Sequence, residues 1–369
     1  MRVLKFGGSS VSDAGNMSRV LDIVEEAAAS EKVILVSSAI SGCTDSLIEI
    51  GARAAAGKDY GEIVTGIRER HHRVVNRLFS GRERNAVTFD IDSILSELSC
   101  LASIITIAGV ATPQQELEMQ TYGELLSTRI LAAKLKAEAV NAKWLDSRDI
   151  IVKDDLKRTY SNIRRAISRS RRDVFVAPGF IARESSGTVT TLGRGGSDYS
   201  AAIFAAAAGA PCVEIWTDVP GIMTANPKTV PQARTIRHLS YDAAFCMAEH
   251  GAKVLYAPTV TPAREKGIPI IVRNTFDPSF TGSVIDGDMP ADICRWVGVS
   301  SLGHDDYEDI FITAEGEFQA RQAQARGIEA LKDAGISAVG SDSGDGFVCF
   351  TVMRSTAREA CITLHTEFI

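Results

Sequence analysis

Paired cysteines and long apolar runs are both missing from this 369-residue sequence. Its seven cysteines are odd in number and scattered, and none stands in a C-x-x-C pair. This usage fits neither a disulfide framework nor a zinc site, so we interpret the cysteines as reduced thiols. No stretch approaches the ~18 apolar residues of a membrane span, and the N-terminal segment turns glycine-rich before a signal-peptide core could form. The sequence therefore predicts a cytoplasmic protein with no membrane partner.

An excess of positive charge is also missing, because 46 acidic residues outnumber 40 basic ones and the formal net charge is -6. Nucleic-acid binding depends on basic surface, and the one basic stretch, residues 156–172, is explained by a solvated helix face. We expect no nucleic-acid partner. Isolated imidazoles such as His71, His72 and His250 show no ligand spacing, so we expect structural roles for them and no protein metal site.

Two kinds of segment alternate along the chain, which is long enough for two domains. Short β-branched runs alternate with longer alanine-rich stretches of helical spacing, and residues 59–112 form a polar, helix-compatible insertion. Such alternation is typical of an α/β fold with a mainly parallel central sheet and helices on both faces. Predicted strands are Val33–Ser37, Val174–Pro178, Cys212–Thr217 and Ile268–Arg273, and predicted helices are Asn16–Ala29, Gly123–Leu135 and Ser200–Ala208.

A change in pattern near Asp286–Ile293, marked by glycine and proline, predicts a linker. The segment that follows has the predicted order β, α, β, β, α, which suits a ferredoxin-like α+β module whose final strand is missing unless Trp296–Ser300 supplies it. We therefore predict a catalytic domain over 1–290 and a smaller module over 291–369.

The first glycine-rich turn follows the first predicted strand and contains Lys5, Gly7, Gly8 and Ser9. Its glycines allow backbone N–H groups to approach a phosphate, and Lys5 supplies a positive charge. The lysine precedes the glycines, which differs from the spacing of a P-loop. A plain turn with a surface lysine is the alternative interpretation.

The second glycine-rich turn, Thr191–Asp198, precedes an alanine-rich helix. Arg194 has the chemistry to hold a carboxylate through two hydrogen bonds, and the helix N-terminus favours anions. Asp198 stands where a helix cap would, which is its structural alternative. We expect Arg194 and Asp198 to form a buried pair of charges.

Together with four further segments in the same order, these two turns closely resemble aspartokinases of the amino-acid kinase superfamily over residues 1 to 290. The resemblance implies an amino-acid kinase fold followed by an ACT regulatory module, and ATP-dependent phosphorylation of the L-aspartate side chain, the first step of lysine, threonine and methionine biosynthesis. It also implies the cofactors ATP and Mg²⁺. The four further segments are Ser37–Asp45, Tyr122–Ser127, Trp216–Gly221 and His250–Leu255.

The resemblance also implies roles for individual residues. Lys5 would contact the transferring phosphoryl group, and Asp198 would hold the catalytic constellation. The aspartate-binding set would be Ser38, Thr44, Glu124, Arg194, Gly195, Gly196 and Ser197, with Glu124 facing the ammonium group and Arg194 a carboxylate. The ATP-binding set would be Lys5, Gly7, Gly8, Ser9, Thr217, Asp218, Met223, Lys228 and Lys253.

Some of these positions have a structural alternative or depart from the family's pattern. The hydroxyls of Ser38 and Thr44 commonly cap or turn a backbone, and Glu124 and Lys253 could be solvated surface residues. Met223 stands where many members have tyrosine, Lys228 where they have arginine, and Tyr256–Pro258 replaces a common His-Pro. These departures bear on base stacking, at Met223, and on one phosphate contact, at Lys228.

The implied chemistry needs no catalytic histidine, because a side-chain carboxylate with a pKa near ~3.9 is already a nucleophilic anion at neutral pH. It needs charge neutralisation and in-line positioning instead. Alternatives are another kinase of the superfamily, such as acetylglutamate or glutamate 5-kinase, and a regulatory subunit that binds amino acids without kinase activity.

Family members commonly carry two ACT modules, and this chain has room for about one. It is either a short form or the front part of a longer polypeptide, such as one fused to homoserine dehydrogenase. We expect a lysine or threonine effector and a homo-oligomer, a dimer or tetramer, because an unpaired sheet edge invites pairing between subunits.

Overall fold

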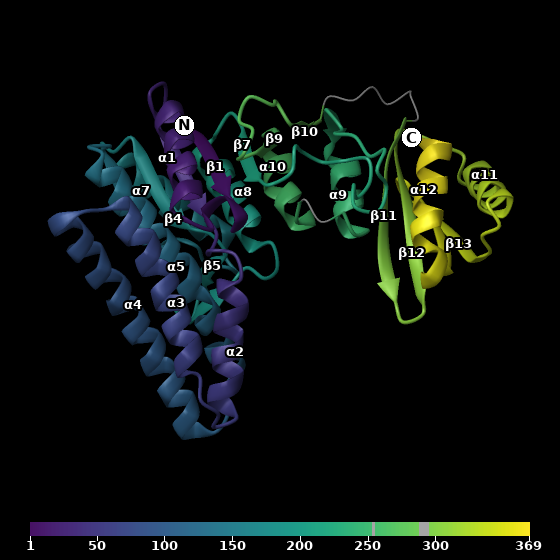
Figure 1. Cartoon of the computed structure of the whole chain (residues 1–369). Helices are drawn as coiled ribbons and strands as arrows, with labels where there is room; N and C mark the ends of the chain where they lie inside the picture. Colours follow the sequence, from purple (N-terminus) through teal and green to yellow (C-terminus); the bar gives the residue numbers. More distant parts are fainter. Residues whose placement is uncertain (253–254, 288–294) are drawn as a thin grey trace. The chain divides into compact units, whose positions relative to one another are not determined.

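The computed structural model describes residues 1–252, 255–287 and 295–369. The chain divides into two compact units (Figure 1). The first comprises Met1–Asp218 and Thr275–Pro278, and the second comprises Val219–Asn274 and Ser279–Ile369. The boundary predicted between residues 290 and 291 lies outside the described residues, so the predicted domain limits stay a prediction.

Five parallel strands form the sheet of the first unit, in the order β3-β4-β2-β1-β7. Their apolar side chains are almost entirely buried in β2 and β4, as expected for strands covered on both faces. The predicted α/β architecture with a mainly parallel sheet is therefore confirmed. The strands are β1 (Arg2–Phe6), β2 (Val33–Ser37), β3 (Ala142–Trp144), β4 (Val174–Pro178) and β7 (Val213–Thr217).

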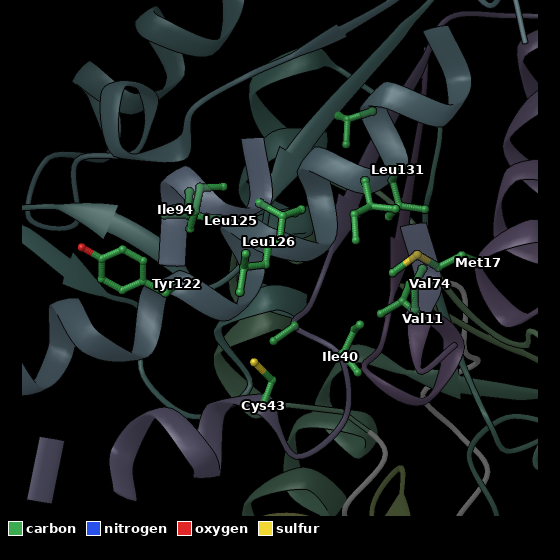
Figure 2. Close-up of a cluster of buried hydrophobic side chains, with 14 of the residues drawn as sticks. Val11, Met17, Ile40, Cys43, Val74, Ile94, Tyr122, Leu125, Leu126 and Leu131 are labelled. Carbon is green, nitrogen blue, oxygen red and sulfur yellow. The ribbon is translucent and has the colours of Figure 1, made fainter. Parts of the chain in front are cut away.

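The helices of this unit contribute apolar side chains to its hydrophobic core. Side chains from several of them, among them Met17, Ile94 and Leu126, gather in one buried cluster (Figure 2). The elements are η1 (Ser9–Val11), α1 (Ala14–Ala28), α2 (Cys43–Ala55), α3 (Gly61–Leu78), α4 (Gly81–Ala108), α5 (Pro113–Ala137), α6 (Ser147–Ile150), α7 (Leu156–Ser168) and α8 (Gly196–Ala208), with the short strands β5 (Ile181–Arg183) and β6 (Val189–Thr191).

The predicted helical insertion is present as α3 and α4, which pack against each other and against α5. By length and composition alone, α4 is apolar enough to cross a membrane, which the sequence analysis did not anticipate. The inner face of α4, including Ile91, Leu95 and Leu98, is buried in the core cluster. The core helices of soluble proteins can be equally long and apolar, so this property is weak evidence for a membrane span.

The second unit begins with a small mixed sheet, in which β10 pairs parallel with β8 and antiparallel with β9. Helix α9 begins at a serine cap, Ser240, whose side chain accepts a hydrogen bond from the Ala243 amide. The elements are β8 (His238–Ser240), α9 (Tyr241–Glu249), η2 (Ala257–Thr259), α10 (Val260–Lys266), β9 (Ile270–Asn274) and β10 (Ser283–Asp286).

An antiparallel sheet in the order β11-β12-β14-β13 completes the second unit, and its shape fits an ACT-like module. Figure 1 shows α11 and α12 beside this sheet. The strand β11 contains Trp296–Ser300 and pairs along the edge of β12, so it supplies the strand that the predicted order β, α, β, β, α was missing. The elements are β11 (Arg295–His304), β12 (Tyr307–Glu315), α11 (Ala320–Asp333), β13 (Ala338–Gly344), β14 (Phe347–Met353), η3 (Arg354–Thr356) and α12 (Ala357–Phe368).

Candidate functional site

Lys5 stands near the carboxyl end of β1, paired with Val36 of β2 on one side and Ile215 of β7 on the other. Its side chain is buried, and its Nζ lies 2.6 Å from Oδ1 of Asp198, which is also buried. Two charges removed from water are tolerated when they neutralise each other, so this ion pair holds an ammonium group at the edge of the sheet. The interpretation of Lys5 as a surface lysine is wrong.

Gly8 is required where the turn after β1 approaches the next loop. A Cβ at this position would lie 2.9 Å from the Ala39 carbonyl oxygen, a distance that real Cβ atoms essentially never show. The same turn is held by two backbone hydrogen bonds, from Gly7 N–H to the Trp216 carbonyl and from Ser41 N–H to the Gly8 carbonyl. This close packing ties the Lys5 turn to the loop after β2. The predicted approach of backbone N–H groups to a phosphate stays a prediction.

Glu124 is buried within α5 and is 4% exposed, so its interpretation as a solvated helix residue is wrong. Its Oε1 accepts a hydrogen bond from the Ala39 amide at 3.1 Å. Its Oε2 is buried and has no hydrogen-bond partner within the described ranges. Burial raises the pKa of this carboxyl to about 8, while the Ala39 hydrogen bond and the charge of Lys5 act in the opposite direction. An unpaired buried oxygen of this kind is suited to a cationic hydrogen-bond donor.

Ser127, one turn beyond Glu124, was not identified from the sequence as a site residue. Its hydroxyl donates to the Ser38 carbonyl at 2.7 Å, so α5 holds both ends of the Ser38–Ala39 segment. The side chains of Ser38 and Thr44 are half-buried on either side of this loop. A serine inside a helix gives no sequence signal for such a role, because its partner is a backbone group far away in the chain.

The second glycine-rich turn leads into α8 through Gly195, which has a φ of 68° and occupies the N-cap position. Such a φ is uncommon for other residues, which explains the glycine. Asp198 therefore lies in the first turn of the helix and is not its cap. Ser197 and Gly196 are buried beside it.

The expected buried pair of Arg194 and Asp198 is wrong. Asp198 pairs with Lys5, and Arg194 is exposed and has no ion pair among the residues that the structure describes. The physical reason is the left-handed turn at Gly195, which separates the direction of Arg194 from that of the helix. Arg194 consequently presents its five N–H donors to solvent, where a carboxylate can reach them.

Gly179, which the sequence analysis also missed, follows β4 and faces this turn. A Cβ there would come within 2.7 Å of the Ser197 Cβ, so only glycine allows the two segments to pack this closely. A glycine directly after a fully buried strand is the signal that could have identified it.

The other residues of the predicted ATP-binding set lie at the end of β7, in the second unit and outside the described residues. Thr217 is half-buried at the end of β7 and Asp218 is exposed, with the Thr217 hydroxyl 3.3 Å from the Asp218 carboxylate. Met223 and Lys228 belong to the second unit, where Met223 is half-buried and Lys228 is exposed. Lys253 lies outside the described residues, so its role stays a prediction. No group of three or more His, Cys, Asp or Glu side chains in the described ranges is arranged to hold a metal.

The known proteins that resemble this chain belong to one family of kinases. The family model described as "Amino acid kinase family" matches residues 1–274. A bifunctional aspartokinase/homoserine dehydrogenase of Haemophilus influenzae is 30% identical, and the match covers 100% of this chain and 46% of that protein. Lysine-sensitive aspartokinase 3 of Escherichia coli is 35% identical over 77% of this chain and 63% of its own length. The chain thus spans about half the length of such curated relatives.

Solved structures agree on the fold. Aspartokinase III of Escherichia coli, in complex with aspartate and ADP, is 29% identical with a TM-score of 0.75, and the match covers 96% of this chain and 79% of that one. The aspartate kinase of Clostridium acetobutylicum has a TM-score of 0.81 over 100% of both chains at 22% identity, which is evidence for the fold alone.

Proposed function

This chain belongs to the amino acid kinase family, and we propose that it is an aspartate kinase, which transfers the γ-phosphoryl group of ATP to the side-chain carboxylate of L-aspartate. The observation that carries the proposal is Glu124, a buried carboxyl whose Oε2 is unpartnered in the described ranges and whose environment includes the Lys5 charge. The names of its relatives, which are aspartokinases and bifunctional enzymes containing one, support the same activity.

Glu124 and Arg194 would recognise the two ends of the amino-acid substrate. An ammonium group donating to Oε2 of Glu124 would satisfy the unpaired acceptor and favour the ionised carboxylate, because an opposite charge lowers a carboxyl pKa. Arg194 would hold a carboxylate through two parallel hydrogen bonds. Thr44, Ser38 and the turn Gly195–Ser197 would complete the aspartate site.

Lys5 would neutralise the charge that moves with the phosphoryl group, and Asp198 would keep its ammonium group in place. The aspartate carboxylate oxygen forms the new bond to the γ-phosphorus, and the bond from phosphorus to the bridging oxygen of ADP breaks. The nucleophile is already an anion, so no general base is required. Gly7, Gly8 and Ser9 would line the phosphate site, and the backbone N–H groups of Gly8 and Ser9 would face the phosphates, because that of Gly7 is bonded to the Trp216 carbonyl.

The nucleotide would also meet Thr217, Asp218, Met223, Lys228 and Lys253, as the resemblance implies. Mg²⁺ would be held chiefly by the nucleotide's phosphates, since this ion commonly retains waters and needs few protein ligands. It would supply additional charge neutralisation at the transferring group.

Regulation, assembly and location are further parts of the proposal. The ACT-like sheet and helices of residues 295–369 would bind an amino-acid effector, lysine or threonine, and one solved relative is described in complex with lysine and aspartate. We also propose a homo-oligomer that acts in the cytoplasm, with a catalytic domain over 1–290 and a regulatory module over 291–369.

A hydroxamate assay for acyl phosphate tests the activity. The purified chain is incubated with ATP and Mg²⁺ and with L-aspartate, N-acetyl-L-glutamate or L-glutamate, with and without lysine or threonine. Of the three amino acids, we expect only L-aspartate to give a hydroxamate signal. This signal should be lost in Lys5→Ala and in Arg194→Ala. Lys58→Ala, which changes an exposed lysine after α2, should retain it. Turnover of another substrate, or of none while an amino acid still binds by calorimetry, would exclude the aspartate kinase assignment.

A further inference from the structure

A cavity of about 340 Å³ lies between the N-terminus of α2 and the side of α3, within the first unit. Gly42, Cys43 and Ser46 line it from α2, and the other lining residues come from Ile63 to Arg73 on α3. None of them belongs to the aspartate and ATP sets described above. The cavity is therefore a separate feature of the fold.

Two arginines of α3, Arg70 and Arg73, line this cavity. Arg70 is half-buried, and one of its N–H groups donates to the Ser41 carbonyl at 2.6 Å, which leaves other N–H donors of the guanidinium available. Arg73 lines the exposed part, with its guanidinium 4.0 Å from the Glu69 carboxylate. Helix α2 begins at Gly42 without a side-chain cap, and the acidic residue of its first turn, Asp45, is exposed. A helix N-terminus with adjacent guanidinium groups favours an anion.

His71 supplies an independent observation. It lines the cavity, is fully buried, and its Nδ1 lies 2.8 Å from the Ile67 carbonyl oxygen. Because a carbonyl only accepts, Nδ1 carries the hydrogen and Nε2 is an acceptor, for which the described part of the chain offers no donor. Burial is the main cause that lowers the pKa of this imidazole to about 4, the Ile67 hydrogen bond opposes it and the charges of Arg70 and His72 add to it, so the ring is neutral at pH 7. A buried acceptor without a donor is unfavourable, which suggests that a ligand provides one.

Gly66 lines the cavity and, as a glycine, contributes no side chain to it. It lies in the middle of α3, where glycine is less favourable than alanine by about 1 kcal/mol. A Cβ at this position would meet nothing within 4 Å, so packing does not require glycine there. Because Gly66 is itself a lining residue and a Cβ there has open space around it, a larger side chain would add bulk at the wall of the cavity.

We propose that this cavity binds a phosphate group that keeps one O–H, as inorganic phosphate or a phosphate monoester does near neutral pH. Phosphate oxygens would accept hydrogen bonds from Arg70 and from the backbone N–H of Gly42, the N-cap residue of α2, and the O–H would donate to Nε2 of His71. Both charge and hydrogen-bond direction are then satisfied, whereas sulfate offers the charge without the donor. The proposal does not depend on the proposed kinase activity, and the cavity adjoins the loop after β2, because its lining residue Arg70 donates to the Ser41 carbonyl.

The test is a titration of the full chain with inorganic phosphate, phenyl phosphate or sulfate at constant ionic strength, followed by NMR of ¹⁵N-labelled histidine side chains. The His71 signal is assigned by its loss in His71→Phe. We expect phosphate to shift the His71 Nε2 resonance and to bind at least ten-fold more tightly than sulfate. The stronger of the two phosphate compounds identifies whether the free ion or a monoester is the better ligand.

Gly66→Leu is the decisive variant, because leucine is favourable in a helix and adds bulk at a lining position whose Cβ meets no other atom within 4 Å, so no existing contact is removed. We expect Gly66→Leu and Arg70→Gln to weaken phosphate binding at least ten-fold, and Arg84→Gln, an exposed arginine of α4, to leave it unchanged. Equal affinity for sulfate, an unmoved His71 signal, or a phosphate-induced shift of the His71 signal that survives in a folded Gly66→Leu chain would each overturn the proposal. Phosphate bound at the Lys5 turn would survive in Gly66→Leu, so the two sites are distinguishable.

Discussion

At the scale of single residues, Glu124 shows how burial prepares a side chain for a ligand. Its carboxyl is enclosed by protein, and burial raises its pKa to about 8. In the folded chain the protonated form is therefore favoured. The stability that this group contributes is complete below its unfolded pKa of 4.5 and is lost as the pH rises towards 8.

Replacing this group by an amide should consequently stabilise the empty protein and impair substrate recognition. We expect Glu124→Gln to raise the free energy of unfolding by roughly 1–3 kcal/mol at pH 8 and by much less at pH 5. The KM for aspartate should increase at least ten-fold, since a neutral amide does not attract an ammonium group. Urea unfolding at the two pH values and initial rates measure both effects. An amide variant that loses stability at pH 8 would contradict the cause given for the pKa shift.

Gly8 supplies a second prediction, because its missing Cβ leaves room for the Ala39 carbonyl. In Gly8→Ala the two loops must move apart, and displacements of this size at a reacting centre lower rates by about 10²-fold. We expect kcat/KM for ATP to fall by about that factor, as measured by the hydroxamate assay. Gly340→Ala, whose new Cβ would have only ordinary contacts at 3.6 Å, is the matched control and should retain full activity.

At the scale of elements, α5 carries the residues that hold the loop after β2, and it begins with a reciprocal cap. The Thr112 side chain accepts from the Gln115 amide, the Gln115 side chain accepts from the Thr112 amide, and Pro113 occupies the first turn. Local sequence thus determines where this helix starts. Its register then decides that Glu124 and Ser127 face the Ser38–Ala39 segment.

Loss of this cap should affect stability and not substrate binding, because Glu124 lies three turns further along the helix. We expect Thr112→Ala to lower the free energy of unfolding by about 1 kcal/mol with KM for aspartate unchanged. Urea denaturation and steady-state kinetics measure the two quantities. Thr65→Ala, an exposed threonine of α3, should change stability by less than about 0.5 kcal/mol. A raised KM in Thr112→Ala would mean that the cap also sets the position of Glu124.

At the scale of the whole molecule, His71 links pH to folding in the direction opposite to Glu124. Its pKa falls from 6.5 to about 4 on burial, so unfolding takes up a proton below pH 6.5. The stability from its neutral form is present above pH 6.5 and is lost as the pH falls towards 4. We expect the urea midpoint to fall more steeply between pH 7 and pH 4.5 in the wild type than in His71→Phe. Parallel curves for the two proteins would contradict this role of His71.

Much of the architecture could be predicted from local sequence, because its signals act over a few residues. The strands β2 and β4 were predicted with the bounds they have, and the helix α1 within two residues at either end, whereas α5 begins ten residues and α8 four residues before the predicted start. Continuous apolar runs indicate strands buried on both faces, and helical periodicity survives in the surface helices. The position of β11 in the ACT-like sheet was decided only by pairing with β12, a contact that leaves no local signature.

The residues of the candidate site also fall into two groups, those that the local sequence indicates and those whose role only the tertiary structure decides. Glycines indicate two backbone constraints in the sequence itself, because a Cβ at Gly8 would clash with the Ala39 carbonyl and Gly195 has a positive φ. The partner of Asp198, the burial of Glu124 and the role of Ser127 depend on segments about 90 residues or more apart and were decided by tertiary structure alone. Sequence determines which local conformations are accessible, and packing decides which charges are taken out of water and which groups then neutralise them.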